Sequence, residues 1–192
     1  MRGLSGEAVH GDRAVVAPHP GGVLVAVIDG LGHGQEAARA ADRAVEVVSS
    51  CPGEDLAAVV ERCHRELRSS RGVVMTAVSL SFAAGTMSSV GVGNVQGMIV
   101  RASAPDGRPS RDFILLRGGV VGHTLPSLRR TVVPLLHGDT LVLATDGVSI
   151  EFTTEQQLDG EPRALAERIL ERYALHTDDA LVLVVRYAGG MR

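Results

Sequence analysis

VLVAVIDG, residues 23–30, and LVLATDG, residues 141–147, are the two stretches that decide how this chain folds. Each is an apolar strand that leads into an Asp-Gly pair, whose acidic residues are Asp29 and Asp146. A carboxylate at the mouth of a buried strand, next to a glycine that lets a ligand approach the backbone, is typical of a metal site. The two stretches therefore predict acidic residues from distant segments that converge on hard divalent cations.

The Asp-Gly pair is also the commonest turn dipeptide, so either pair alone would indicate only a turn. The context favours a site, because each pair follows a strand with no polar residue to bury and Asp178-Asp179 opens a third such strand, residues 181–185. Carboxylates crowded at one sheet end repel one another unless a cation neutralises them. An oxygen-only ligand set suits Mg²⁺ or Mn²⁺, whereas zinc would favour histidine or thiolate.

Composition limits the class of protein. A chain of 192 residues with no change of composition along its length predicts a single domain over residues 1–192. The net charge of −3 and the few aromatic residues, two tyrosines and three phenylalanines, argue against nucleic-acid binding. No apolar run approaches the roughly 20 residues that span a bilayer, and residues 1–11 do not form a signal peptide. Cys51 and Cys63 make neither a disulfide framework nor a zinc site, so we expect a cytoplasmic protein without a membrane partner.

The periodicity of the apolar residues predicts mixed secondary structure. The chain opens with a hairpin, residues 8–17 and 22–28, and continues with two amphipathic helices, residues 34–50 and 54–70. The second half contains the following runs: short strands at 73–82, 87–92, 97–101 and 112–116, with a turn at 103–110, a strand at 140–145, a helix at 162–173 and a last strand that ends at 187. We expect the short strands to form an antiparallel meander. Because the central strands are apolar on both faces, the pattern predicts two stacked sheets flanked by helices.

A competing interpretation concerns the glycine-rich loop after the strand at 22–28. Gly30-Leu31-Gly32-His33-Gly34 follows a strand and opens a helix, as a dinucleotide-binding loop does, but its spacing is GxGxG and Asp29 would repel a pyrophosphate. The sequence contains no nucleophile elbow, Walker loop or HExxH motif. His33 is either a phosphate contact or proton donor, or a residue that caps or packs. Ser149 is expected to cap a helix or turn.

Several short motifs occur together in a fixed order. They are Gly11-Asp12, Asp29 to Gly34, Gly93-Asn94, Arg117-Gly118-Gly119 with Gly122, Ala144 to Gly147, and Asp178-Asp179. The ordered set resembles the metal-dependent serine/threonine phosphatases of the protein phosphatase 2C type. It is most similar to their small bacterial branch, the SpoIIE- and RsbX-like phosphatases, which includes a stressosome feedback phosphatase. The resemblance implies an α+β fold, a four-layer αββα sandwich of two antiparallel sheets flanked by helices.

The resemblance also implies a centre of two ions, Mn²⁺ or Mg²⁺, and a role for each acidic residue. Asp29 would bridge the ions, the Gly30 carbonyl would bind one of them, and Asp146 and Asp178 would hold the metal of the last motif. Asp12 would complete the site, mainly through water. A metal-activated water held by Asp12, Asp29 and Asp146 would then attack the phosphoryl group.

Further residues would support these ligands or contact the substrate, namely His33, Asn94, Gly147 and Asp179. Asp178 is preferred to Asp179 as a ligand because the family uses the first residue of its closing acidic pair. The sequence departs from the family at Leu31, where many relatives carry a histidine proposed as general acid. It also lacks a counterpart of their phosphate-binding arginine near the N-terminus. No insertion is available for a flap, so the cleft should be open.

The implied reaction is hydrolysis of phosphoserine or phosphothreonine on a bacterial signalling protein. The expected partners are phosphorylated stressosome components with STAS-type domains, whose dephosphorylation would reset a stress response. One alternative substrate is a phosphorylated anti-anti-sigma factor. A catalytically inactive module that only binds phosphoprotein is the alternative from another class, but the retained carboxylates argue against it, because they would repel one another to no purpose.

Overall fold

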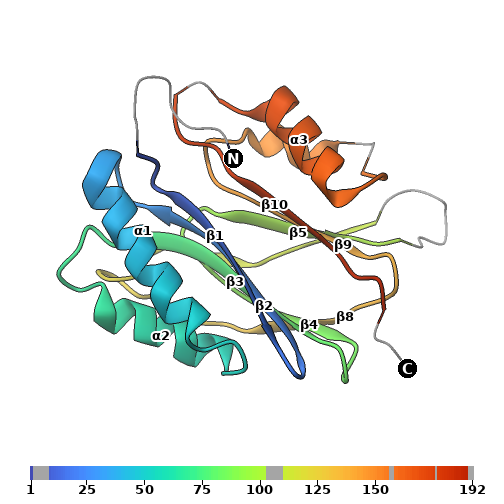
Figure 1. Ribbon diagram of the computed structural model, residues 1–192, viewed down its shortest axis with the longest axis horizontal. Helices are drawn as coiled ribbons and strands as arrows, with labels where there is room; N and C mark the ends of the chain where they lie inside the picture. Colours follow the sequence, from blue (N-terminus) through green and yellow to red (C-terminus); the bar gives the residue numbers. More distant parts are fainter. Residues whose placement is uncertain (2–8, 103–109, 156–157, 176, 190–192) are drawn as a thin grey trace.

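Two stacked β-sheets lie between two layers of helices in the computed structural model, which describes residues 1, 9–102, 110–155, 158–175 and 177–189. Helices α1 (Gly34–Ser49) and α2 (Leu56–Glu66) cover one sheet, and α3 (Pro162–Tyr173) covers the other (Figure 1). The predicted α+β fold and its αββα layers are therefore confirmed.

The first sheet contains the N-terminal hairpin. Its four long strands are β1 (Asp12–His19), β2 (Gly22–Gly30), β3 (Val73–Ser81) and β4 (Thr86–Val92), and they pair in that order as antiparallel neighbours. Two short strands, β7 (Leu116–Arg117) and β8 (Thr131–Pro134), both pair with β4. Because β2 is antiparallel to both of its neighbours, the glycine-rich loop after it is not part of a parallel dinucleotide-binding unit.

The second sheet is built from the C-terminal half of the chain. Its strands are β5 (Gln96–Val100), β6 (Arg111–Phe113), β9 (Thr140–Ala144) and β10 (Val182–Arg186), in the antiparallel order β10-β9-β5-β6. A short 3-10 helix, η1 (Ile150–Thr154), follows β9, and Ser149 caps it by accepting a hydrogen bond from the Glu151 amide, as predicted.

The predicted antiparallel meander is wrong in its pairing. β4 and β5 lie in different sheets, and the predicted strand at 112–116 divides between β6 in one sheet and β7 in the other. β7 pairs with β4 in parallel, and β8 was not predicted. Strands that are buried on both faces look alike in sequence, so the pattern does not tell which partner each one takes.

Smaller differences concern the ends of elements. α2 is shorter than the predicted 54–70, because the Asp55 side chain caps its first turn and the helix ends at Glu66. The start of the predicted first strand at residue 8, and the predicted turn at 103–110 except for residue 110, lie outside the described residues.

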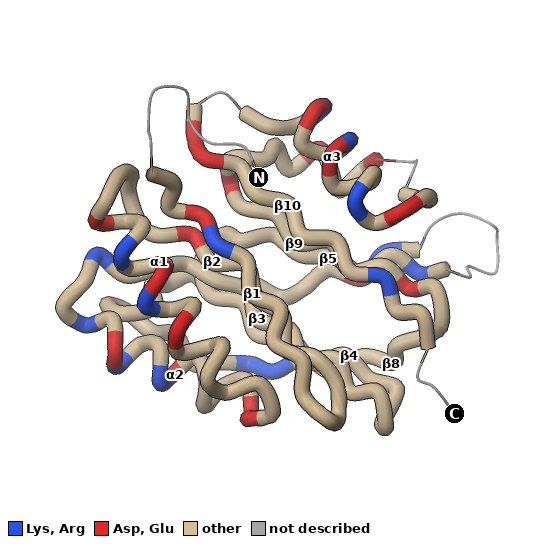
Figure 2. The backbone as a smooth tube through the Cα atoms, viewed as in Figure 1, with Lys and Arg blue, Asp and Glu red and all other residues tan. Residues whose placement is uncertain are grey.

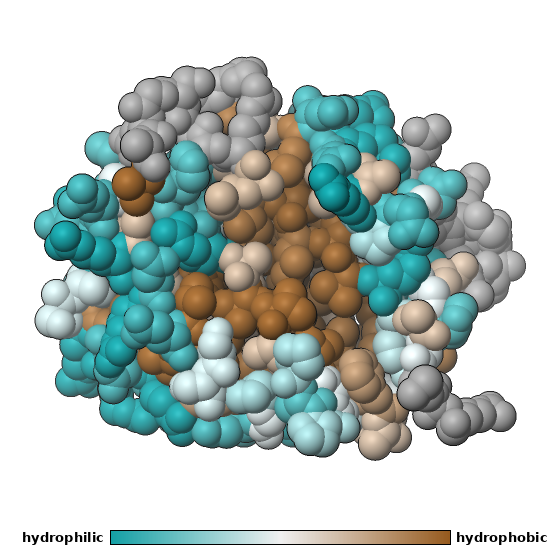
Figure 3. Space-filling model, in the orientation of Figure 1, coloured by the Kyte–Doolittle hydropathy of each residue, from teal (hydrophilic) through white to brown (hydrophobic). Residues whose placement is uncertain are grey.

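Three layers of hydrophobic core fill the sandwich. Side chains alternate along β2, so that Ala26 and Ile28 pack under α1 and α2 whereas Val25 and Val27 pack between the sheets. A third cluster, which includes Phe152, fills the space under α3. Figure 3 shows a hydrophobic band between the two hydrophilic helical layers, where the sandwich is seen from its edge.

The two cysteines, Cys51 and Cys63, are buried free thiols of the core under α1 and α2. None of the helices in the described part of the chain is both long and apolar enough to cross a membrane.

Candidate metal centre

The acidic residues meet at one end of the sandwich because of how the strands run. β1 begins and β2 ends at this end, so Asp12 pairs directly with Asp29 across the hairpin. β9 ends there and β10 begins there, which brings Asp146 from the second sheet to the same place as Asp178. Figure 2 shows acidic positions close together at the end shared by β1, β2 and β10. Residues separated by more than 100 positions in the chain thus share one end of the fold.

A cleft of about 560 Å³ opens between these strand ends. Asp29, Asp146 and Asp178 line it together, although the chain carries them on three separate segments. His33 and Asn94, predicted as supporting residues, also line it. Asp29 is half-buried, while Asp146 and Asp178 are exposed in the cleft mouth.

Asp12 lies behind the cleft wall, with only 2% of its surface exposed. The Thr145 hydroxyl donates a hydrogen bond of 2.7 Å to Asp12 Oδ2 and accepts one of 2.9 Å from the Leu181 amide. The Thr145 hydroxyl therefore links Asp12 of the first sheet to the end of β9 and the start of β10 in the second sheet. Asp12 is not among the residues that line the open cleft, and its expected role through water stays a prediction.

Asp179 is buried beside Asp12 and holds the backbone of the site. Its Oδ2 accepts a hydrogen bond of 2.8 Å from the Gly11 amide, and its Oδ1 lies 3.3 Å from His10 Nδ1. Its own amide donates a 2.8 Å hydrogen bond to Asp178 Oδ1. Asp179 therefore fixes both the start of β1 and the orientation of its exposed neighbour.

The glycines of the two Asp-Gly pairs allow backbones to pack without a gap. A Cβ on Gly30 would lie 2.1 Å from the Ala37 carbonyl oxygen in α1. A Cβ on Gly147 would lie 1.8 Å from the Asp179 carbonyl oxygen. Only glycine permits these approaches, which hold each aspartate against a neighbouring element. Neither glycine is among the residues that line the cleft, so the expected ligand role of the Gly30 carbonyl stays a prediction.

Asn94 is placed by the tight turn after β4. Its Nδ2 donates a hydrogen bond of 2.7 Å to Asp146 Oδ2, across the gap between the sheets. The preceding Gly93 has a φ of 92°, a conformation that side chains rarely adopt. This hydrogen bond fixes the orientation of the Asp146 carboxylate through Oδ2, and Oδ1 does not take part in it.

Burial and mutual repulsion change the acidity of the group. Burial raises the pKa of Asp29 to about 8, and repulsion from Asp12 adds to it. Burial likewise raises the pKa of Asp12 to about 7, although the hydrogen bond from Thr145 opposes this. The pKa of Asp178 is also raised, first by partial burial and then by Asp146. Carboxylates in this arrangement ionise fully near neutral pH only when positive charge is supplied.

The donor set fits hard divalent cations that keep part of their water shell. Carboxylate oxygens are the ligands that Mg²⁺ and Mn²⁺ take in proteins. Among the described residues, no three His, Cys, Asp or Glu side chains stand close enough to hold one ion by themselves. Water would therefore complete the coordination, as it usually does for Mg²⁺, and an open cleft admits it.

His33 occupies the N-cap position of α1, with φ −136° and ψ 167°, but its side chain makes no capping hydrogen bond. The imidazole instead lines the cleft and lowers the pKa of Asp178, a smaller effect than burial. The alternatives of proton donor and packing residue both stay predictions.

The structure adds residues that the sequence did not single out. Thr177 and Val74 line the cleft, and the Thr145 hydroxyl joins the sheets. In the sequence, Thr145 is marked only by its position directly before Asp146. No pattern marked Thr177 except its position directly before Asp178.

Comparison with known proteins supports one family. The model of the family described as "Stage II sporulation protein E (SpoIIE)" matches residues 19–188. The chain is 21% identical over 180 residues to "Phosphoserine phosphatase RsbX" of Bacillus subtilis (strain 168), covering 94% of this chain and 88% of RsbX.

Solved structures extend the similarity to the whole fold. A chain of the structure described as "The bacterial stressosome: a modular system that has been adapted to control secondary messenger signaling" is 30% identical, with a TM-score of 0.82 over 96% of this chain and 95% of that one. RsbX in complex with magnesium has a TM-score of 0.83 at 18% identity, over 95% and 89% of the two chains. The SiaA-PP2C domain of Pseudomonas aeruginosa has a TM-score of 0.74 at 20% identity, over 97% and 84%. The chain therefore belongs to the SpoIIE family of PP2C-type protein serine/threonine phosphatases.

Proposed function

We propose that this phosphatase dephosphorylates phosphoserine or phosphothreonine on stressosome components, proteins with STAS-type domains, and so resets a stress response. The observation that carries the proposal is the acidic cleft where Asp29, Asp146 and Asp178 meet. The 30% identity to a chain of a stressosome structure and the similarity to RsbX support the choice of substrate.

Each acidic residue has a distinct place around the proposed ions. Asp29, the Gly30 carbonyl, Asp146 and Asp178 would hold two Mn²⁺ or Mg²⁺ ions, and Asp12, behind the cleft wall, would support them mainly through water. When bound, such ions acidify a water molecule and neutralise charge on the phosphoryl oxygens. The carboxylates would be ionised in that state, since bound cations reverse the effect of burial on their pKa.

The residues around the carboxylates keep them in place for this chemistry. Asn94 orients Asp146, and Thr145 orients Asp12, through hydrogen bonds of 2.7 Å each. Rigid placement matters because positioning and electrostatic stabilisation account for most of phosphoryl-transfer catalysis. The proton for the leaving oxygen would come from water or from His33, which lines the cleft, since the Leu31 side chain has none to give.

A reconstitution experiment tests the proposal. Stressosome proteins phosphorylated by their kinase are incubated with the purified chain and Mn²⁺, and the lost phosphosites are mapped by mass spectrometry. We expect loss of phosphate from the STAS-type proteins and turnover of para-nitrophenyl phosphate in parallel assays. Hydrolysis of a phosphorylated anti-anti-sigma factor instead would identify the alternative substrate. Binding without turnover of any of these substrates would contradict the enzymatic function.

A further inference from the structure

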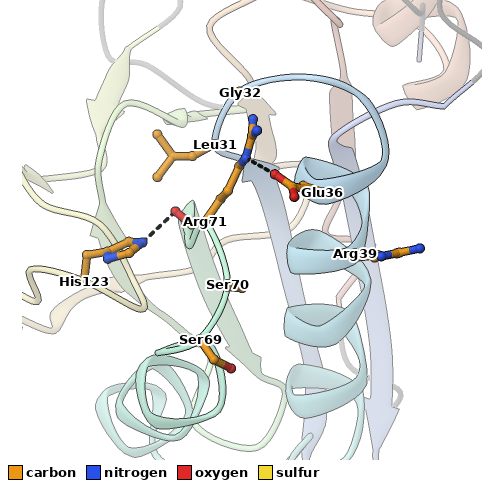
Figure 4. Close-up of a pocket in the computed structure, with 8 residues that line it drawn as sticks. All are labelled: Leu31, Gly32, Glu36, Arg39, Ser69, Ser70, Arg71 and His123. Atoms are coloured by element: carbon orange, nitrogen blue, oxygen red, sulfur yellow. Dashed lines mark hydrogen bonds and ion pairs between the residues drawn. The ribbon is translucent and has the colours of Figure 1, made fainter.

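A second groove, of about 740 Å³, adjoins the metal cleft. Leu31 and Gly32 line both, so the two hollows border each other at the loop after β2. Figure 4 shows the groove between the first turns of α1 and the loop that joins α2 to β3, with the Arg71 side chain extending along it toward Gly32. A ligand held in this groove would lie directly beside a phosphoryl group held in the metal cleft.

Arg71 supplies the positive charge in this groove. Its Nη1 lies 2.7 Å from the point where a Cβ on Gly32 would be, so the absence of a side chain there makes room for the guanidinium. The Arg71 carbonyl is 2.9 Å from His123 Nε2, which fixes the backbone of the loop. Arg39 also borders the groove, but Figure 4 shows its side chain directed to the other side of α1.

Glu36 holds Arg71 in a pair that a ligand can replace. Arg71 Nε lies 2.6 Å from Glu36 Oε2, and the two side chains are 47% and 65% exposed. Exposed ion pairs contribute little to stability, and a guanidinium has five N–H donors. A second carboxylate can therefore bind the same guanidinium, or displace Glu36, at small cost.

We infer that this groove binds the polypeptide that flanks the phosphoserine, and that Arg71 pairs there with an acidic side chain of the substrate. The inference rests on the proposed function, since it takes a phosphoprotein as the ligand. Arg71 does not line the metal cleft, which places it beside the phosphoryl group rather than on it. No lysine or arginine is among the described residues that line the metal cleft, so Arg71 at its border supplies the cation that would select an acidic flank. Leu31, which lines both the groove and the metal cleft, provides apolar surface between them.

Steady-state kinetics on matched phosphopeptides test this inference. Peptides carry aspartates on both sides of the phosphoserine or asparagines at the same positions, and kcat and KM are measured with Mn²⁺ for wild type, Arg71→Gln and Arg68→Ala. Arg68 is exposed on the same loop but does not line the groove. We expect the acidic-to-neutral ratio of kcat/KM to fall about tenfold in Arg71→Gln through KM, and to stay unchanged in Arg68→Ala.

Two more variants make the test independent of a general loss of structure. Glu36→Gln, which frees Arg71 from its partner, should raise the preference for the acidic peptide, and Arg71→Glu should reverse it in favour of a peptide with flanking lysines. An equal loss on all peptides in Arg71→Gln, or an unchanged ratio, would overturn the inference. Wild-type turnover distinguishes the two failures. No turnover of para-nitrophenyl phosphate, the phosphopeptides or the phosphoproteins would refute the proposed function, whereas turnover without a preference for the acidic peptide would refute only the inference about the groove.

Discussion

At the scale of single residues, Asp146 has the clearest role that can be tested. It lines the cleft, accepts a hydrogen bond from Asn94, and raises the pKa of Asp12, Asp29 and Asp178 by repulsion. Asp146→Asn keeps the size of the side chain and removes its charge. We expect Mn²⁺-dependent hydrolysis of para-nitrophenyl phosphate to fall by about 100-fold or more, as for loss of a group that acts directly on the transition state.

The same variant makes an opposite prediction for stability without metal. One repelling charge is gone, so the metal-free protein should melt at the same temperature as wild type or slightly higher. Asp42→Asn is the matched control, because Asp42 lies on α1 in an exposed pair with Arg13. Near-wild-type hydrolysis by Asp146→Asn would show that this residue is not a ligand.

The sequence could predict those site residues that lie next to a recognisable local pattern, such as an apolar strand. Asp29, Asp146 and Asp178 were predictable because each adjoins an apolar strand, so their burial context was visible in the sequence. The position of Arg71 beside the cleft could not be predicted, because Arg71 lies in a loop between α2 and β3 that carries no motif. Its position beside Gly32 exists only after α1 and β3 have packed against the same strand.

At the scale of elements, those formed by local signals could be predicted from the sequence, whereas the long-range pairing of strands could not. The β1–β2 hairpin and α3 were predictable, since a Pro-Gly turn and an amphipathic period act within a few residues. The passage of the chain from β4 into the other sheet at β5 was not, because both strands are buried on both faces and neither indicates a partner. Tertiary packing decides such pairings.

The contact between the loop after β9 and the segment before β10 gives a prediction at this scale. In Gly147→Ala the new Cβ would meet the Asp179 carbonyl oxygen at 1.8 Å, so the segment with Asp178 must shift. We expect a loss of about 1 to 3 kcal/mol in the free energy of unfolding. Hydrolysis should fall by about 100-fold, because a displacement of about 1 Å is enough for such a loss.

Thermal melts and Mn²⁺-dependent turnover measure both effects. Gly53→Ala serves as the control, since its Cβ would meet nothing closer than the His19 ring at 3.7 Å and it lies outside the cleft. If Gly147→Ala behaved like Gly53→Ala in both assays, the close approach of these two segments would not be needed to shape the site.

For the whole molecule, the site joins the two sheets, so metal binding and folding are linked. The folded-state pKa values of Asp12 and Asp29, about 7 and about 8, lie above the ordinary 3.8 of an unfolded chain. Between pH 3.8 and about 8 the folded protein therefore binds more protons than the unfolded one. Stability without metal should consequently fall as the pH rises through this window.

Divalent cations should reverse this trend, because they bind the ionised carboxylates and release protons. At a free Mg²⁺ concentration about 100 times its Kd, the folded state gains about 2.7 kcal/mol, or roughly 5 to 10 °C in Tm for a chain of this size. The gain should be larger at pH 8 than at pH 6, where protons compete with the metal for Asp29. Thermal melts with EDTA or Mg²⁺ at the two pH values measure it. Because the centre joins both sheets, the increase in Tm should appear as one cooperative transition, and it should shrink in Asp146→Asn. Equal gains at both pH values would mean that these carboxylates do not exchange protons for the metal.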